Sequence, residues 1–217
     1  MSLLADRSGA PCLWDALERS FAEQGKRPLL VHRLDKGTSG VLLIATEPAR
    51  QAELARAFNA RTVRKFYVAD IVGRLDLEGT GTIDLALRKG RKSRYRVAGQ
   101  RDAIVRRGNT WRLSGRREDG VDATTHLRRL VGNARRTTLA LHPTTGRTHQ
   151  LRVHLAWIGH PIVGDHLYGK PDDPNQRAPR LALHCHRLVV PLASGTVTVR
   201  SPIPDRDLAI APTSAGS

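Results

Sequence analysis

A nine-residue segment, His32–Gly40, places an acidic side chain among basic and small residues. Its sequence, HRLDKGTSG, carries Asp35 at the end of an apolar stretch, followed by two glycines, a threonine and a serine. Glycine lets the backbone approach another group closely, and backbone N–H groups with the Thr38 and Ser39 hydroxyls can hold an anion. The glycine and lysine spacing of a P-loop is absent. The segment therefore predicts either a site in which Asp35 does chemistry or a β-hairpin turn that Asp35 helps to form.

A second segment, Thr144–Leu155, contains arginines and histidines around a glycine turn. Arg147 stands where a helix is expected to begin, and the free N–H groups of a helix N-terminus favour phosphate or carboxylate. Arg147 and Arg152 both offer planar guanidinium groups for bidentate pairing with such anions. His149 and His154 are five residues apart, which matches poorly the four-residue spacing of two metal ligands on one helical face. Histidines held by structural hydrogen bonds are therefore favoured over a zinc site.

The elements that position these segments follow from the hydrophobic pattern. Regular spacing of apolar residues predicts helices over 13–24 and 46–59, the second capped by Thr46, and a helix from Thr148 to Ile158. Strands are predicted at 29–33, 41–46, 63–72, 81–87, 94–98, 103–107, 110–114, 121–130, 135–142, 181–191 and 196–200. This strand-rich, unrepeated order predicts an α+β fold with a largely antiparallel sheet in a single domain over 1–217. Residues 206–217 are expected to form a flexible tail.

The charge balance favours a polyanionic partner. Thirty-six basic and 20 acidic residues give a formal net charge of +16. Residues 74–136 hold 17 basic and 7 acidic side chains, a net charge of +10. Concentration of the excess in one stretch indicates a binding surface, for nucleic acid first and an anionic membrane surface second. The alternative is an arginine-rich codon bias, because only six of the basic residues are lysines.

Composition excludes several other classes of protein. The 40% hydrophobic and 26% charged content is typical of a soluble globular chain. The longest apolar runs are too short to cross a bilayer, and the N-terminus shows no signal-peptide core. Two cysteines, Cys12 and Cys185, predict no disulfide framework. We therefore expect a cytoplasmic protein without a membrane association.

Four blocks of the sequence resemble the RluA family of RNA pseudouridine synthases. HRLDKGTSG at 32–40 is similar to the family's active-site signature, and KFYVA at 65–69 to its tyrosine motif. GRTHQLRVHL at 146–155 resembles its C-terminal block, and LALHCHRLVVP at 181–191 the strand that follows. The resemblance spans roughly residues 32–205. It implies a mixed, largely antiparallel sheet with flanking helices around a basic cleft.

The resemblance also implies roles for individual residues. Asp35 matches the catalytic aspartate that detaches uracil from its ribose, and Tyr67 matches the tyrosine that stacks on the target base. Arg147 matches an arginine that forms an ion pair with the aspartate. Arg33 matches a residue that fills the stack left by the flipped base. The further residues expected to contact RNA are His32, Thr38, Ser39, His149 and Arg152.

The resemblance implies an isomerase that acts on structured RNA, ribosomal or transfer. Isomerisation within one nucleotide needs no cofactor or metal, and we expect a monomer without a protein partner. The family's opening strand and Lys-Pro-Ala-Gly-type loop are not found, so the chain is expected to begin after them. The region 88–120 matches the family only loosely. A noncatalytic RNA-binding module is the alternative function. A carboxylate-dependent hydrolase is a further class, but it needs a second acid, and the sequence suggests no such pair.

Overall fold

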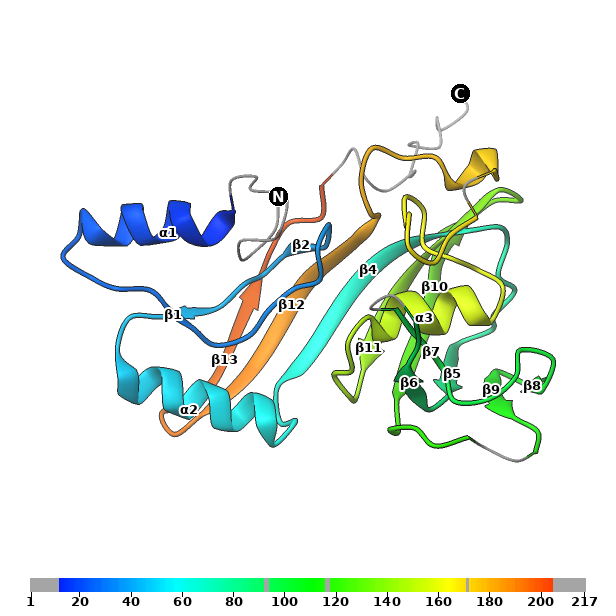
Figure 1. The fold of residues 1–217 in the computed structure, drawn as a ribbon, viewed down its shortest axis with the longest axis horizontal. Coiled ribbons are helices and arrows are strands. Elements are labelled where there is room, and N and C mark those ends of the chain that lie inside the picture. The colour runs from blue at the N-terminus through cyan, green and yellow to red at the C-terminus, as the bar shows by residue number, and fades with distance from the viewer. Residues whose placement is uncertain (1–11, 92–93, 116–117, 171, 205–217) are drawn as a thin grey trace, which may run out of the picture.

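A large, mostly antiparallel sheet organises the chain (Figure 1). The computed structural model describes residues 12–91, 94–115, 118–170 and 172–204, so the predicted tail at 206–217 lies outside the described residues. The strands follow one another across the sheet in the order β13-β12-β4-β11-β10-β5-β9-β8, and β2 pairs with β12. Their bounds are β2 Ser39–Gly40, β4 Arg64–Val72, β5 Thr80–Asp84, β8 Ile104–Arg107, β9 Thr110–Leu113, β10 Thr124–Gly132, β11 Arg136–Pro143, β12 Leu183–Leu192 and β13 Gly195–Arg200.

Strand β4 lies in the interior of this sheet because its sequence suits a strand with two partners. RKFYVADIV is rich in β-branched and aromatic residues, which pack well on a pleated surface. It pairs antiparallel with β11, where Leu141 lies opposite Tyr67, and with β12, where Cys185 lies opposite Tyr67. The register with β12 shifts between Cys185 and Arg187, which leaves His186 as an extra residue.

Two small strand pairs complete the β structure. β1 (Leu29–Leu30) pairs with β3 (Ile44–Ala45), and β6 (Leu87–Lys89) pairs with β7 (Tyr95–Val97), both antiparallel. The HRLDKGTSG segment forms the loop that follows β1 and ends with the two residues of β2.

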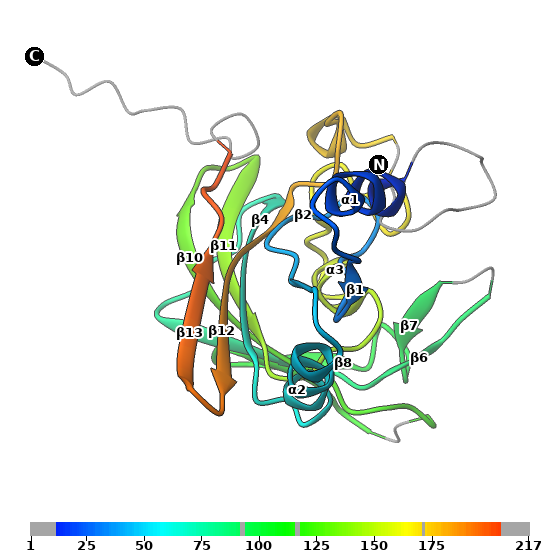
Figure 2. The same cartoon turned by 90° about the vertical axis from the view of Figure 1, so that its left-hand side faces the viewer.

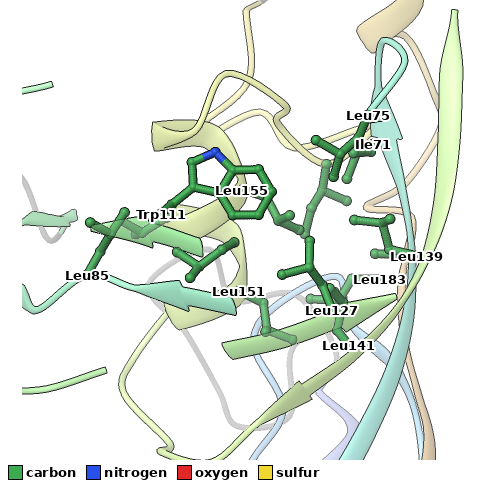
Figure 3. Close-up of a cluster of buried hydrophobic side chains, with 14 of the residues drawn as sticks. Ile71, Leu75, Leu85, Trp111, Leu127, Leu139, Leu141, Leu151, Leu155 and Leu183 are labelled. Carbon is green, nitrogen blue, oxygen red and sulfur yellow. The ribbon is translucent and has the colours of Figure 1, made fainter. Parts of the chain in front are cut away.

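The α-helices of the described residues all lie on one side of the large sheet (Figure 2). They are α1 (Leu13–Ala22), α2 (Pro48–Asn59) and α3 (Gln150–Trp157), and a short 3-10 helix covers Pro174–Gln176. The buried residues of α3 include Leu151 and Leu155. Figure 3 shows these leucines among apolar side chains of the sheet. Burying each such side chain contributes about 1.5–3 kcal/mol, so α3 and the sheet stabilise each other.

A second, smaller core lies under α2. Val41, Val63, Cys185 and Leu188 are buried there, and Phe58 of α2 packs against them. This core joins the end of the HRLDKGTSG segment to strand β12, so it helps to fix the loop that carries Asp35.

The predicted α+β fold with a largely antiparallel sheet is confirmed. The predicted helix caps are wrong: α2 is preceded by Glu47 rather than capped by Thr46, and α3 is preceded by His149 rather than capped by Thr148, with no side-chain cap bond at either end. The pair β1–β3 is shorter than the strands predicted at 29–33 and 41–46. Among the described residues, no helix has the length and apolar character needed to span a membrane.

Candidate active site

A cleft of about 840 Å³ opens on the helix side of the sheet, between the HRLDKGTSG loop, β4, the β6–β7 pair and the N-terminus of α3. Among the described residues, its lining contains five cationic side chains and a single carboxylate, that of Asp35. The cations are Arg33, Arg61, Lys65, Lys89 and Arg147. This lining suits a polyanionic ligand, and it places one acidic group at the position where that ligand would lie.

The loop around Asp35 is fixed by close backbone contacts. The backbone carbonyl of Asp35 accepts a hydrogen bond from the Thr38 N–H at 2.9 Å, which closes a turn. Gly40 has a φ of 111°, and a side chain at this position would collide with the backbone of Cys185. Gly40 therefore allows the loop to approach strand β12 closely, as the glycines predicted, and this contact positions the loop.

The Asp35 carboxylate is partly buried, and burial raises its pKa from the ordinary value. The charges of His149, Arg152 and Arg33 act in the opposite direction. Within the described part of the chain, the carboxylate forms no hydrogen bond or ion pair. A partly desolvated carboxylate without a hydrogen-bond partner is available to a ligand in the cleft.

Among the arginines, Arg152 rather than Arg147 has the largest effect on the pKa of Asp35, after that of His149. The described structure shows no ion pair between Arg147 and Asp35, because the Arg147 Nε donates to the backbone carbonyl of Asp122 at 3.0 Å. Arg152 is only 7% exposed, and its guanidinium donates to both Asp165 oxygens at 2.8 and 2.7 Å. Arg152 is thus bound to Asp165 through Nε and Nη2, and its expected contact with RNA stays a prediction.

Tyr67 reaches the cleft from β4. Burial raises its pKa well above the ordinary value, and the neighbouring Cys185 thiol and Asp35 carboxylate act in the same direction. The phenol is therefore neutral at physiological pH. Lys65 lies two residues earlier on the same face of the strand and also lines the cleft.

His149 precedes α3 in the left-handed backbone region, with a φ of 56°. Its Nδ1 lies 2.8 Å from the Tyr168 hydroxyl, which accepts a hydrogen bond from the Tyr95 N–H at 2.9 Å. Burial lowers the His149 pKa, and the Asp35 charge opposes this shift. His149, predicted to bind RNA, thus lines the cleft within the electrostatic field of Asp35.

The other predicted RNA contacts divide into two groups. Arg33, His32 and Thr38 line the cleft, and the Thr38 hydroxyl oxygen is buried without a hydrogen-bond partner in the described structure. His32 is held by the Leu43 N–H, which donates to its Nε2 at 3.0 Å, and burial lowers its pKa to about 4. Ser39 does not line the cleft, because its hydroxyl lies 2.8 Å from the Nδ1 of His184 on β12.

Sequence reasoning missed Gln150, which holds the turn before α3. Its Oε1 accepts hydrogen bonds from the Thr145 hydroxyl at 2.7 Å and the Arg147 N–H at 3.0 Å. Its Nε2 donates to the Thr124 carbonyl at 3.0 Å and the Thr125 hydroxyl at 3.1 Å. The GRTHQLRVHL block contains Gln150, but a lone glutamine carries no sequence signal for this structural role.

Among the described residues, no group of three or more histidine, cysteine, aspartate or glutamate side chains could hold a metal ion. The predicted hydrogen-bonded role of the histidines holds for His154, which is fully buried between the Thr125 hydroxyl and the Leu85 carbonyl at 3.0 and 2.9 Å.

A largely antiparallel sheet with one aspartate in a cleft lined by cations is the arrangement that the family resemblance implied, and the comparisons with known proteins agree on the family. A family model described as RNA pseudouridylate synthase matches residues 7–157. The chain belongs to the RNA pseudouridylate synthase family. The resemblance to the RluA members of this family is confirmed.

Individual relatives show the extent of the similarity. The chain is 37% identical over 190 residues to ribosomal large subunit pseudouridine synthase D of Nitrosomonas europaea, covering 84% of this chain and 50% of that protein. It is 35% identical to dual-specificity RNA pseudouridine synthase RluA of Escherichia coli, covering 79% and 72%. The chain therefore spans about half the length of some relatives. The structure of human RNA pseudouridylate synthase domain containing 1 matches with a TM-score of 0.71 and 30% identity, covering 88% of this chain and 74% of that one.

Proposed function

We propose that this chain isomerises specific uridines in structured RNA, ribosomal or transfer, to pseudouridine. The observation that carries the proposal is the position of Asp35, the single carboxylate in a cleft lined by five cations. A surface that only binds RNA gains nothing from this charge and loses Coulomb attraction for phosphate. The names of the relatives cited above, which are RNA pseudouridine synthases, support the same reaction.

The reaction moves one glycosidic bond within a single nucleotide. The bond between uracil N1 and ribose C1′ breaks, and a bond between uracil C5 and C1′ forms. The proton on C5 is lost and a proton is gained at N1, so the reaction needs no oxidant or co-substrate. We propose that Asp35 acts as the nucleophile or charge partner for the detached ribose and base, because its carboxylate has no described hydrogen-bond partner.

The other cleft residues suit the handling of a flipped uridine. A base inside a stem must leave its stack, which costs a few kcal/mol. The neutral ring of Tyr67 offers an apolar face beside Asp35. Arg33 is exposed at the cleft, so its guanidinium can occupy the position that the base leaves. Arg147 is free to turn toward phosphate, because it is held by one hydrogen bond to a backbone carbonyl.

Asp35→Asn tests this function. Asparagine keeps the size of the side chain but removes its negative charge and nucleophilicity. We expect the variant to fold, to bind RNA as well as the unchanged protein or better, and to form no pseudouridine. Mapping of pseudouridine in RNA from cells with and without the gene identifies the substrate on which to measure this.

Asp76→Asn is the matched control, because Asp76 is exposed and pairs with Arg74 on the surface. It should retain full activity. A noncatalytic RNA-binding module predicts that none of these proteins forms product. Turnover by Asp35→Asn close to that of the unchanged protein would remove Asp35 from the mechanism.

A further inference from the structure

The face of the large sheet that points away from the helices carries arginines and stacked rings. Lys65 and Tyr67 line the cleft, so Phe66 between them points to the opposite face. There the His142 ring stacks on Phe66 at a centroid distance of 4.7 Å, and His126 lies 6.3 Å beyond His142. None of the described α-helices covers this face (Figure 2).

Arg187 continues this row on strand β12. The extra residue His186 reverses the alternation of side chains between the two faces of the sheet. Cys185 therefore faces the cleft side, and Arg187 faces outward. The Arg187 guanidinium lies 4.1 Å from the centroid of the Phe66 ring. A guanidinium that stacks on a ring through its face keeps its N–H edge for an anion. The Arg187 Nε is buried and has no hydrogen-bond partner in the described structure.

The row ends in a pair of like charges. Arg200 on β13 lies directly opposite Arg187 in the antiparallel register, an arrangement that destabilises a sheet unless an anion lies nearby. Arg64 and Arg128 are exposed on the same face, as the strand alternation places them. The side chains of all four arginines lack a hydrogen bond or ion pair with any other described residue.

Negative charge is almost absent from this part of the sheet. Asp70 is the one acidic residue in strands β4, β10, β11, β12 and β13. It is 1% exposed and accepts a hydrogen bond from the Thr138 hydroxyl at 2.6 Å. The four arginines therefore form a positive surface, which we call the outer arginine face, and Asp70 is the one acidic residue in these five described strands.

We propose that the outer arginine face, made up of Arg64, Arg128, Arg187 and Arg200, binds backbone phosphates of the RNA whose uridine enters the cleft. The proposal rests on the proposed function, and it adds a second contact surface and a substrate class. The cleft and this face lie on opposite sides of one sheet. A short stem-loop in the cleft cannot reach around the sheet, whereas a large folded RNA can contact both sides. The outer arginine face thus selects for large structured RNA.

The test removes the paired arginines. Arg187→Gln/Arg200→Gln lowers the net charge by two, and Arg50→Gln/Arg74→Gln is the matched control, since these exposed arginines pair with Glu53 and Asp76 on the surface. Dissociation constants are measured at physiological salt for an unmodified large-subunit ribosomal RNA transcript and for a short stem-loop transcript. Loss of two phosphate contacts should weaken binding of the long transcript about tenfold or more. Binding of the stem-loop should change no more than in the control.

Other outcomes overturn the proposal. The outer arginine face does not bind RNA if the double variant binds the long transcript as tightly as the unchanged protein does. The same conclusion follows if the control variant loses as much affinity as the double variant. Loss of binding to phosphatidylglycerol vesicles with unchanged RNA affinity would assign the face to an anionic membrane instead. Arg200→Gln alone, on the edge strand, serves if thermal unfolding shows that the double variant is unfolded.

Pseudouridine formation by the unchanged protein on the same transcripts is measured separately. Failure of the function itself, with no product from any transcript, is therefore distinguishable from failure of the outer-face proposal.

Discussion

At the residue scale, the position of Asp35 could be predicted from the sequence and its electrostatic partners could not. A carboxylate among small and basic residues is visible in HRLDKGTSG, and the structure places it in a cleft. The expected partner Arg147 is bound to a backbone carbonyl instead, while Arg152, expected on RNA, is buried against Asp165. Which of two arginines five residues apart faces a distant loop depends on tertiary packing. Local sequence does not contain that information.

The raised pKa of Asp35 predicts a pH-dependent effect on stability. A carboxyl group whose pKa is higher in the folded state stabilises that state below its unfolded pKa, and this stabilisation disappears as the pH rises through the folded pKa. Asp35→Asn removes a buried charge at neutral pH. We therefore expect the melting temperature of Asp35→Asn to exceed that of the unchanged protein at pH 7. The difference should shrink as the pH falls toward about 4, the ordinary aspartate pKa.

Thermal unfolding followed by circular dichroism over this pH range measures the effect, with Asp76→Asn as the control. The pKa of Asp76 is lowered rather than raised, chiefly because its carboxylate accepts a hydrogen bond from Arg74. A lower melting temperature for Asp35→Asn at pH 7 would show that the carboxylate stabilises the fold, contrary to this prediction.

At the element scale, the long strands could be predicted and the short ones could not. The stretch 63–72 was predicted as a strand from its β-branched and aromatic residues, and β4 covers Arg64–Val72. Strand β2, with two residues, forms because Gly40 fits against the backbone of Cys185, and no periodicity marks such a contact. Likewise, the turn before α3 is fixed by the Gln150 side chain rather than by the predicted Thr148 cap.

Gln150→Ala tests the importance of this turn. Gln150 is 4% exposed and forms four hydrogen bonds that alanine cannot replace. At about 0.5–1.5 kcal/mol each, their loss should lower the free energy of unfolding by roughly 2–6 kcal/mol. Urea denaturation measures it, and pseudouridine formation should fall as well because Arg147 and His149 share the turn.

Gln51→Ala provides a matched control, because the Gln51 side chain donates one hydrogen bond to the Leu30 carbonyl, away from the cleft. A loss of stability for Gln150→Ala no larger than for Gln51→Ala would show that the backbone alone maintains the turn.

At the scale of the whole molecule, the cations that line the cleft do not come mainly from the most basic stretch of the sequence. The +10 segment 74–136 was expected to form the binding surface, yet Lys89 is the one cation of that segment among the five that line the cleft. Other arginines of the segment have partners: Arg88 and Arg96 both bind Glu118. The fold thus gathers cleft cations from several segments, and the same sheet presents the outer arginine face on its other side.

This distribution predicts which arginines and lysines determine the salt dependence of RNA binding. Each cation that contacts a phosphate steepens the slope of log K against log salt concentration by about 0.7–0.9. Arg33→Gln/Lys89→Gln removes two cleft cations, so the slope should flatten by about 1.4–1.8. The dissociation constant of the large-subunit ribosomal RNA transcript, measured between dilute and physiological salt, gives this slope.

Arg106→Gln/Arg112→Gln removes the same charge from the 74–136 segment and outside the cleft lining. Arg106 donates to the Asp76 and Gly108 carbonyls and Arg112 pairs with Asp84, so neither guanidinium is committed to a cleft ligand. Because only direct phosphate contacts release counterions, this control should leave the slope near that of the unchanged protein. If both double variants flatten the slope equally, the RNA responds to net charge over the whole molecule and the cleft has no special part in binding. If the unchanged protein itself shows no salt dependence, its basic residues do not contact phosphate, and the charge excess reflects codon usage.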